Sequence, residues 1–504
     1  MINLLWAFLG TVGAVLLFLA LGALLWRSAF DRFTDRLTMR LFKDKYSENL
    51  WEMVSTLTKI PPQTAVETSL RAQEGMPIRR PLGSPRRFLK FEGLMFSPAQ
   101  VSRLPLPEDE AVDTSVVLGP NARKPLVLSI PVMLGAMAHG LALSEEAKIA
   151  LGKASTLAGT ATNSGEGGFF PPEREAARHY ILQYDRGGWT RDPEILRKAD
   201  MIEVQVGQGS DASAPKRTPS HLIPSVTREL LGLKQGEDAL IHARLPEVND
   251  PEDFVPLVRR IKEQAGGIPV GIKMMASDEL EQDLAVCLRA GFDVITLDGA
   301  QGGTRSSEPT FQDDFGLPTV YAIPRAARFL RRHGVDKRVS LVAAGGLFTP
   351  GDFMKALALG ADAVSIGSIA LLAMTHNQVT KSMPWEPPTE LVYEEGRLKH
   401  HLDGESAARY IANFLRSCIQ EMEAASRAMG KRSFAEFSLT DLCALDELTA
   451  RVTGARLAYP LRFETRGTVK ANRRPIGSMG ARPTYRPEAS RRQTSPSNPG
   501  RLEH

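Results

Sequence analysis

The chain has 504 residues, of which 43% are hydrophobic and 24% are charged. This is ordinary globular composition with ample length for a large core, and the small net charge of +4 does not indicate nucleic-acid binding. The three cysteines, Cys287, Cys418 and Cys443, are far apart and form no CxxC pair. This spacing argues against a disulfide framework and a four-cysteine metal site, and it favours a reducing compartment.

Residues 1–26 contain a long run without charge, from Ile2 to Trp26. As a helix this run would rise roughly 37 Å, which is enough to cross a bilayer with some tilt. A signal peptide is the alternative, but no basic residue precedes the run and no small-residue cleavage site follows it. The sequence therefore predicts a single transmembrane helix.

Basic residues follow this run directly: Arg27, Arg32, Arg36, Arg40, Lys43 and Lys45. By the positive-inside rule they predict an inner-membrane protein whose catalytic body is in the cytoplasm. Residues 27–109 are predicted to form a helical and irregular juxtamembrane region.

Residues 110–375 alternate between β-branched runs and amphipathic helices. Eight runs are typical of strands: 126–134, 159–162, 201–206, 239–244, 268–274, 292–299, 338–346 and 361–368. The clearest helices are predicted at 143–159, 250–266, 278–291 and 349–360. Eight strands, each followed by a helix or a long connection, predict a (β/α)8 TIM barrel. A doubly wound open sheet is the alternative, but no G-x-G-x-x-G opens the first unit.

Two segments follow the predicted barrel. Residues 376–460 contain a long helix at 405–430 and a shorter one within 432–455, which we expect to pack against the barrel as a helical extension. Residues 461–504 are rich in Arg, Pro, Ser and Gly and nearly lack aliphatic residues, so they predict a disordered basic tail. Contact of this tail with anionic lipid is a further possibility.

Glycines end the last two predicted strands, as a pair in "AAGG" (343–346) and singly in "SIGS" (365–368). In a barrel of this type phosphate usually binds at these two strand ends. Glycines allow backbone N–H groups to approach phosphate oxygens, and Ser368 adds a hydroxyl. The pattern therefore indicates a phosphorylated ligand.

Polar residues end three other predicted strands. Asn163 follows the second strand, Gln208 the third and Lys273 the fifth. A lysine buried between apolar residues requires an anionic partner. Two amides and a lysine beside a phosphate site favour a flavin, because amides can bind its pyrimidine edge and the lysine can stabilise charge on the reduced ring. A sugar phosphate is the rival ligand.

Seven motifs occur in the order found in one known family: "LGAMAHGLALSEEA", "TNSGEGG", "IEVQVGQG", "IKM", "DGAQGGT", "AAGGLFTPGD" and "LGADAVSIGS". Together they resemble the FMN-binding synthase domain of glutamate synthase, and most closely its stand-alone, membrane-anchored relatives. The resemblance implies a flavoprotein whose cofactor is FMN. It places these residues around FMN: Gly135, Ala136, Met137, Ala138, Asn163, Gln208, Lys273, Gly302, Gly303, Gly345, Gly346, Gly367 and Ser368. The stretch "NSGEGG" would be rich in glycine because the absence of side chains lets the flavin ring approach the backbone.

The resemblance also implies a reaction, an oxidoreductase step of glutamate biosynthesis that acts on a CH–NH2 group. It is the reductive amination of the oxoacid 2-oxoglutarate through 2-iminoglutarate, with hydride from reduced FMN. The catalytic residues would be Lys273, which tunes the flavin, and Glu166, which orders the substrate or relays a proton. Ammonia would be free or come from a partner, and the electron donor, for which a partner protein is one candidate, is not named by the sequence.

Three departures from the family pattern keep other functions open. Glutamate synthases bind a 3Fe–4S cluster through cysteines after the eighth strand, but residues 373–388 contain none, so no iron–sulfur cluster is expected. Their "QGAKPGEGG" loop reads "QGSDASAPKRTPS", and their "HHD" stretch reads "RLPEVND". The alternatives are an FMN barrel oxidoreductase with another small-molecule substrate, and a membrane-tethered flavin protein without catalytic activity.

Overall fold

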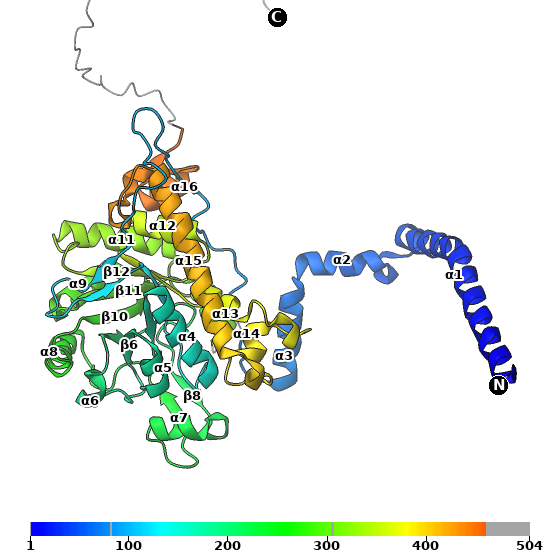
Figure 1. Cartoon of the computed structure of the whole chain (residues 1–504), viewed down its shortest axis with the longest axis horizontal. Coiled ribbons are helices and arrows are strands. Elements are labelled where there is room, and N and C mark those ends of the chain that lie inside the picture. Colours follow the sequence, from blue (N-terminus) through cyan, green and yellow to red (C-terminus); the bar gives the residue numbers. More distant parts are fainter. Residues whose placement is uncertain (1, 81–82, 304–306, 460–504) are drawn as a thin grey trace, which may run out of the picture. The chain divides into compact units, whose positions relative to one another are not determined.

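The computed structural model of this chain describes residues 2–80, 83–303 and 307–459. At its centre are eight parallel strands in the order β4-β13-β12-β11-β10-β7-β6-β5, surrounded by helices (Figure 1). The predicted (β/α)8 barrel is thereby confirmed. Its strands are β4 (Val132–Leu134), β5 (Ala161–Asn163), β6 (His179–Tyr184), β7 (Met201–Gln205), β10 (Val270–Met275), β11 (Val294–Asp298), β12 (Ser340–Ala344) and β13 (Ala363–Ile366).

The barrel closes between β4 and β5, the two ends of this strand order. The hydroxyl of Thr160 donates to the carbonyl of Val132 over 2.7 Å, and the backbone N–H of Ser129 donates to Gly159 over 2.9 Å. Most strand residues are buried on both faces, as expected for a parallel sheet covered by helices.

Two strand assignments made from the sequence are wrong. Residues 239–244 are not a barrel strand, because β9 (Ala239–Ile241) pairs antiparallel with β8 (Lys216–Thr218) in a separate hairpin. The missing barrel strand is β6, which carries polar His179 and Gln183 and follows a helix, and so does not stand out as an apolar run. Strand β7 is therefore the fourth barrel strand and not the third.

The run 126–134, predicted as one strand, forms two. Strand β3 (Leu126–Leu128) pairs antiparallel with β2 (Val116–Leu118), and only β4 enters the barrel. Leu118, Leu126 and Leu128 are buried in one apolar cluster with residues from the starts of the barrel strands, such as Met201 and Val294. The hairpin thus fills the end of the barrel opposite the strand carboxyl ends.

The four predicted helices are present as α4 (Glu145–Ala158), α8 (Phe254–Gln264), α9 (Leu280–Ala290) and α12 (Pro350–Ala358). Ser144 caps α4 by accepting from the N–H of Ala147, and the left-handed glycines Gly159 and Gly291 end α4 and α9. Further helices are α5 (Pro171–Ala176), α6 (Pro193–Leu196), α7 (Ser225–Leu230), α10 (Pro309–Asp314), α11 (Thr319–Arg332), α13 (Ser368–Thr375) and α14 (Pro387–Leu391).

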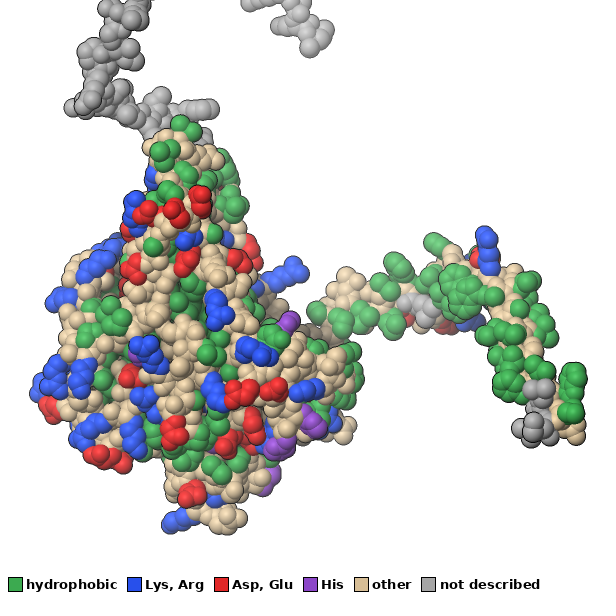
Figure 2. Space-filling model, in the orientation of Figure 1, with side chains coloured by type: hydrophobic (Ala, Val, Ile, Leu, Met, Phe, Trp, Pro, Cys, Tyr) green, Lys and Arg blue, Asp and Glu red, His purple; other side chains and the backbone are tan. Residues whose placement is uncertain are grey.

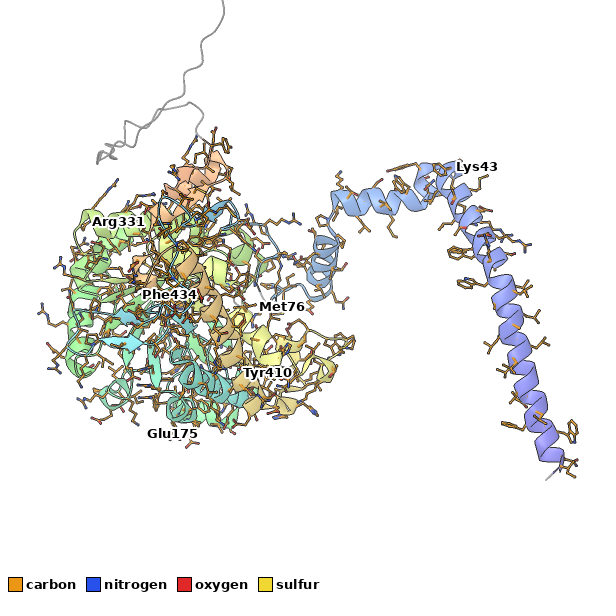
Figure 3. All side chains as sticks on the ribbon, turned by 45° about the horizontal axis from the view of Figure 1, so that its top comes forward. Lys43, Met76, Glu175, Arg331, Tyr410 and Phe434 are labelled. Carbon is orange, nitrogen blue, oxygen red and sulfur yellow. The ribbon has the colours of Figure 1, made fainter. Side chains whose placement is uncertain are left out.

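The C-terminal extension consists mainly of α15 (Gly404–Ala428) and the shorter α16 (Glu447–Thr453). Helix α15, on which Figure 3 labels Tyr410, packs along α4, α12 and α13. Strand β14 (Leu442–Ala444) pairs with β1 (Leu94–Phe96), which precedes the barrel, and with β15 (Arg456–Leu457). The segments before and after the barrel are therefore joined. The predicted tail, 461–504, lies outside the described residues.

Helix α1 spans Ile2–Lys43 and so continues past the predicted end at Trp26 (Lys43 is labelled in Figure 3). Its apolar side chains are exposed, and they cover the helix in the view of Figure 2. By its length and composition, the part of the helix over Trp6–Lys43 could cross a membrane.

Two shorter helices, α2 (Leu50–Lys59) and α3 (Pro62–Glu74), come between α1 and the barrel. Arg80 connects α3 to the barrel. Its guanidinium forms an ion pair with Glu67 of α3, and it donates to both carboxylate oxygens of Asp313 in α10, which are each 2.7 Å away. The neighbouring Arg79 lines the main cavity of the barrel. The segment that follows α3 therefore borders the candidate site.

Candidate active site

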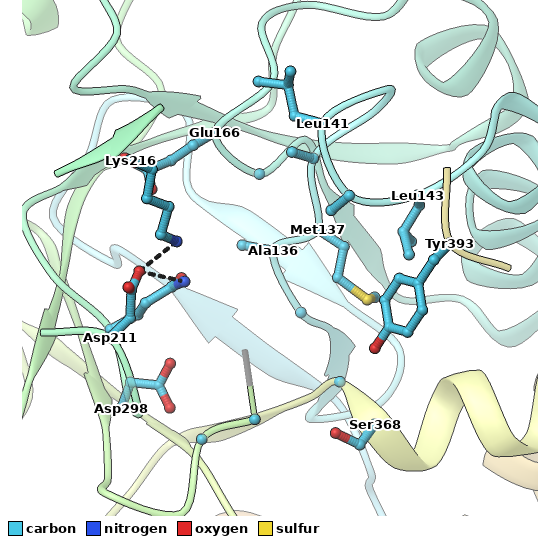
Figure 4. A pocket seen from close by; sticks show the side chains of 18 of the residues that line it. Ala136, Met137, Leu141, Leu143, Glu166, Asp211, Lys216, Asp298, Ser368 and Tyr393 are labelled. Carbon is cyan, nitrogen blue, oxygen red and sulfur yellow. Dashed lines mark hydrogen bonds and ion pairs between the residues drawn. The ribbon is translucent and has the colours of Figure 1, made fainter. Parts of the chain in front are cut away.

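A cavity of about 500 Å³ opens where the barrel strands end in their carboxyl termini. This is the face on which barrels of this type carry their active sites. Thirteen of the fourteen residues predicted for the site line it: Gly135, Ala136, Met137, Ala138, Glu166, Gln208, Lys273, Gly302, Gly303, Gly345, Gly346, Gly367 and Ser368. The exception is Asn163. Figure 4 labels Ala136, Met137, Glu166 and Ser368 among the residues that line the cavity.

One end of the cavity is formed by glycine backbone. Gly345 and Gly346 follow β12 with φ of +93° and +72°, a conformation that residues with side chains rarely adopt. A Cβ atom on Gly345 would lie 2.9 Å from the backbone of Gly299, whereas one on Gly367 would meet nothing within 4 Å. With Ser368 at the first position of α13, this end can surround an anionic group with N–H donors.

The glycines of "NSGEGG" have a structural role that the sequence analysis did not include. A Cβ atom on Gly165 would lie 2.4 Å from the carbonyl carbon of Met137, and one on Gly167 would lie 2.9 Å from the N–H nitrogen of His139. Two backbone segments thus lie directly against each other and form one wall of the cavity. Backbone packing therefore requires glycine here, and the predicted approach of the flavin ring stays a prediction.

Lys273 lies on β10, with its ammonium group in the cavity and its side chain 7% exposed. Its Nζ is 3.3 Å from Oδ2 of Asp298 at the end of β11. Burial alone would lower the pKa of Lys273, but the carboxylates of Asp298 and Glu203 outweigh burial and raise this pKa. The cavity therefore contains a permanent positive charge on a rigid strand.

Glu203 is a buried carboxylate that the sequence analysis did not include. One of its oxygens accepts from the amides of Asn163 and Gln183, both at 2.9 Å, and the other accepts from the hydroxyl of Thr296 at 3.0 Å. Asn163 also accepts from the N–H of Gly165, so its side chain is directed behind the wall and not toward the cavity. A glutamate in the centre of the strand run "MIEVQV" was the available signal.

Glu166 lines the cavity, but both of its oxygens bind one guanidinium. Arg186 donates from Nε to Oε1 at 2.9 Å and from Nη2 to Oε2 at 3.1 Å. Burial alone would raise the pKa of Glu166, but Arg186 holds it below its usual value. Glu166 is therefore a carboxylate near neutral pH, and its fully buried partner Arg186 was missed by sequence reasoning.

The loop after β7 contributes a second ion pair to the lining of the cavity. Lys216 forms an ion pair with Asp211, which also accepts from the amide of Gln208 at 3.3 Å (Figure 4). Ser210 and Ala212 in this loop have φ of 52°, which is strained for residues with a side chain. Asp211 and Lys216 belong to "QGSDASAPKRTPS", where the departure from the family pattern was the only signal.

Residues 88–432 match the family model described as the conserved region in glutamate synthase. The chain belongs to this glutamate synthase family. It is 33% identical over 424 residues to a glutamate synthase large subunit-like protein of Rhizobium meliloti, covering 80% of the chain and 96% of the relative.

More distant members of the glutamate synthase family match over a shorter range. The chain is 31% identical over 329 residues to an archaeal-type glutamate synthase [NADPH] of a Thermotoga species, and it spans 64% of that relative's length. Among solved structures, a lactate oxidase of Pediococcus acidilactici is similar at 16% identity and a TM-score of 0.48, over 70% of this chain and 83% of that one.

Proposed function

We propose that this protein is an FMN-dependent oxidoreductase of glutamate-synthase type. The observation that carries the proposal is the cavity itself, which joins a glycine cradle to a buried lysine. Gly345, Gly346, Gly367 and Ser368 lie at one end, and Lys273 projects from a strand in the same cavity. Membership in the glutamate synthase family supports the same ligand.

The residues of the cavity fit FMN. The volume of about 500 Å³ is within the range of cofactor sites. The open space above Gly367 and the positive φ of its neighbours across the cradle suit a phosphate group, and Gln208 and the backbone of residues 135–138 would hold the ring. Bound FMN would supply hydride transfer, and the Lys273 ammonium would stabilise negative charge at the site.

For the substrate we propose 2-oxoglutarate, which is aminated through 2-iminoglutarate to glutamate. Glu166 would act as a carboxylate that orders the imine and exchanges a proton with it, since Arg186 keeps it ionised. The electron donor and the ammonia come from outside the chain, and a partner protein is one candidate source of electrons.

A second candidate, an FMN oxidoreductase with another small-molecule substrate, is favoured by one observation. Two cations near the cavity, Arg186 and Lys216, are each ion-paired with a carboxylate of the chain. An oxoacid carboxylate would have to compete with Glu166 or Asp211 for them. A membrane-tethered flavin protein without catalytic activity is the remaining alternative, and a substrate-dependent loss of flavin colour would contradict it.

Two measurements test the proposed function. The absorbance spectrum of the purified protein should show flavin and no iron–sulfur cluster, and glutamate should form from 2-oxoglutarate and ammonium when the flavin is chemically reduced. Protein that stays colourless after reconstitution with FMN would refute the cofactor. Flavin that is present but does not turn over these substrates would favour the second candidate.

We also propose that α1 anchors the protein in the inner membrane with the barrel in the cytoplasm. The exposed apolar surface of α1 and the basic residues on one flank support this orientation. Protease added to spheroplasts should leave the barrel intact and should cut it after the membrane is permeabilised. Cleavage of the barrel in intact spheroplasts would overturn the orientation.

A further inference from the structure

Lys148, on the second turn of α4, is a fully buried lysine outside the cavity. Its Nζ donates to the carbonyl of Met137 at 2.7 Å and to the carbonyl of Asn163 at 2.9 Å, and it forms an ion pair with Oε1 of Glu173 at 2.8 Å. An ammonium group has three N–H donors. Its three shortest contacts therefore reach three separate segments of the chain, and a longer contact of 3.5 Å to the carbonyl of Ser164 falls on the segment of Asn163.

Two of these segments form the wall of the candidate site. Met137 belongs to the loop after β4 and lines the cavity, and Asn163 ends β5 just before Gly165 and Glu166, which also line it. These are the segments whose backbones lie against each other through Gly165. The ammonium of Lys148 therefore joins the two layers of the wall from behind.

The third segment anchors the ammonium group. Glu173 lies on α5, and its Oε1 also accepts from the hydroxyl of Thr162 at 2.9 Å. Its Oε2 is buried and has no hydrogen-bond partner within residues 2–80, 83–303 and 307–459. Burial lowers the pKa of Lys148 and raises the pKa of Glu173. Apolar residues of similar volume are often as stable as a buried ion pair, so stability alone does not require these two charges.

We propose that Lys148 is a positioning residue, which holds the loops of Met137 and Asn163 together so that they present one rigid wall to the ligand of the cavity. Naming that ligand as FMN rests on the proposed function. The donor groups of Lys148 fix the wall, and Glu173 keeps the ammonium in place. Neither residue lines the cavity, so neither contacts the ligand.

The test separates positioning from stability. Lys148→Met alone leaves Glu173 buried without its cation and is expected to lower the melting temperature. The double variant Lys148→Met/Glu173→Met removes both charges and should restore the melting temperature to near that of the wild type. It cannot restore the donors to Met137 and Asn163, so we expect its Kd for FMN to stay at least about tenfold above the wild type.

Lys355→Met is the matched control, because Lys355 also donates to a carbonyl, that of Phe91 at 3.1 Å, and does not line the cavity. Fluorescence titration with FMN gives the Kd values. Hydrogen exchange followed by mass spectrometry should show faster exchange of residues 135–140 and 163–168 in the double variant and unchanged exchange in the control.

The outcomes are distinct. A double variant with the FMN affinity and the loop exchange of the wild type would overturn the role of Lys148 and leave the proposed function intact. Wild-type protein that binds no FMN would instead overturn the proposed function and FMN as the ligand. Even then, faster exchange of the double variant confined to the two loops would support the role of Lys148 in holding them together.

Discussion

The two ends of the cavity are built from different chemistry. The cradle at Gly345, Gly346 and Gly367 is made of backbone, and its shape depends on residues that lack a Cβ atom. The opposite end is made of charged side chains, which are paired as Glu166 with Arg186 and as Asp211 with Lys216. A cradle whose shape is set by the backbone suits one kind of group, a phosphate. Paired side chains, in contrast, can be substituted one at a time. We therefore expect substitutions to alter the substrate preference more easily than the binding of the cofactor.

The strongest test of the backbone end is Gly345→Ala. The added methyl would overlap the backbone of Gly299, and overpacking of this kind costs about 1–3 kcal/mol. Because 1.4 kcal/mol is tenfold in affinity, we expect the Kd for FMN to rise by up to about a hundredfold. Gly334→Ala is the control, since Gly334 also has positive φ but has open space around it. Equal affinities of the two variants would refute the cradle.

The charged end is tested by Arg186→Met. This change leaves the Glu166 carboxylate buried without its ion-pair partner, which typically costs about 4 kcal/mol. Urea unfolding should show the loss, and Arg186→Met/Glu166→Gln should recover part of it while keeping FMN affinity near that of the wild type. A large loss of FMN affinity in the double variant would show that this end also holds the cofactor.

Lys273, which lines the same cavity and contacts Asp298, sharpens the comparison. Lys273→Met should slow flavin reduction about a hundredfold, equivalent to about 3 kcal/mol, with a much smaller effect on FMN affinity. If FMN binds as proposed, the ammonium group would stabilise charge on the reduced ring, whereas the cradle would hold the phosphate. The flavin midpoint potential and the Kd are the measurements. An unchanged potential with collapsed affinity would place Lys273 at the phosphate instead.

The sequence predicts the backbone end well, for a physical reason. Glycines at strand ends are local features, so 343–346 and 365–368 could be interpreted without knowing the fold. The order of the barrel strands was harder to predict from the sequence. Strand β6 carries polar residues such as Gln183 because its side chains take part in the Glu203 network, and this hid the apolar signal of a barrel strand.

The charged end could be predicted only in part. Glu166 stood out within a glycine-rich stretch, but its partner Arg186 lies 20 residues away on the segment after β6, the strand that was missed. Lys148 was equally invisible, because it is a lysine on an amphipathic helix, where lysines usually face solvent. Pairings between distant segments depend on tertiary structure, which local patterns do not encode.

The smallest expected effect concerns His139, which follows the cavity-lining residues Met137 and Ala138 in the chain. Its ring stacks on Phe170 with centroids 3.8 Å apart, and its backbone packs on Gly167. Its Nδ1 is buried and has no hydrogen-bond partner among the described residues. Burial, with repulsion from Lys148 as a smaller cause, lowers the pKa of His139 from 6.5 to about 4. The neutral ring is therefore the form that the folded protein accepts.

The sign of the pH effect follows from proton binding. Between pH 6.5 and 4 the unfolded chain binds a proton that the folded chain does not, so the stability contributed by His139 is fully present above pH 6.5 and declines toward pH 4. Between pH 7 and 5.5 the loss should be about 1 kcal/mol. His139→Phe keeps an aromatic ring on Phe170 but cannot titrate, so urea unfolding at the two pH values should show a difference smaller by that amount. If the two proteins lose the same stability, His139 is protonated without cost and the wall tolerates a charge, which would weaken the contrast between a rigid backbone end and an adjustable charged end.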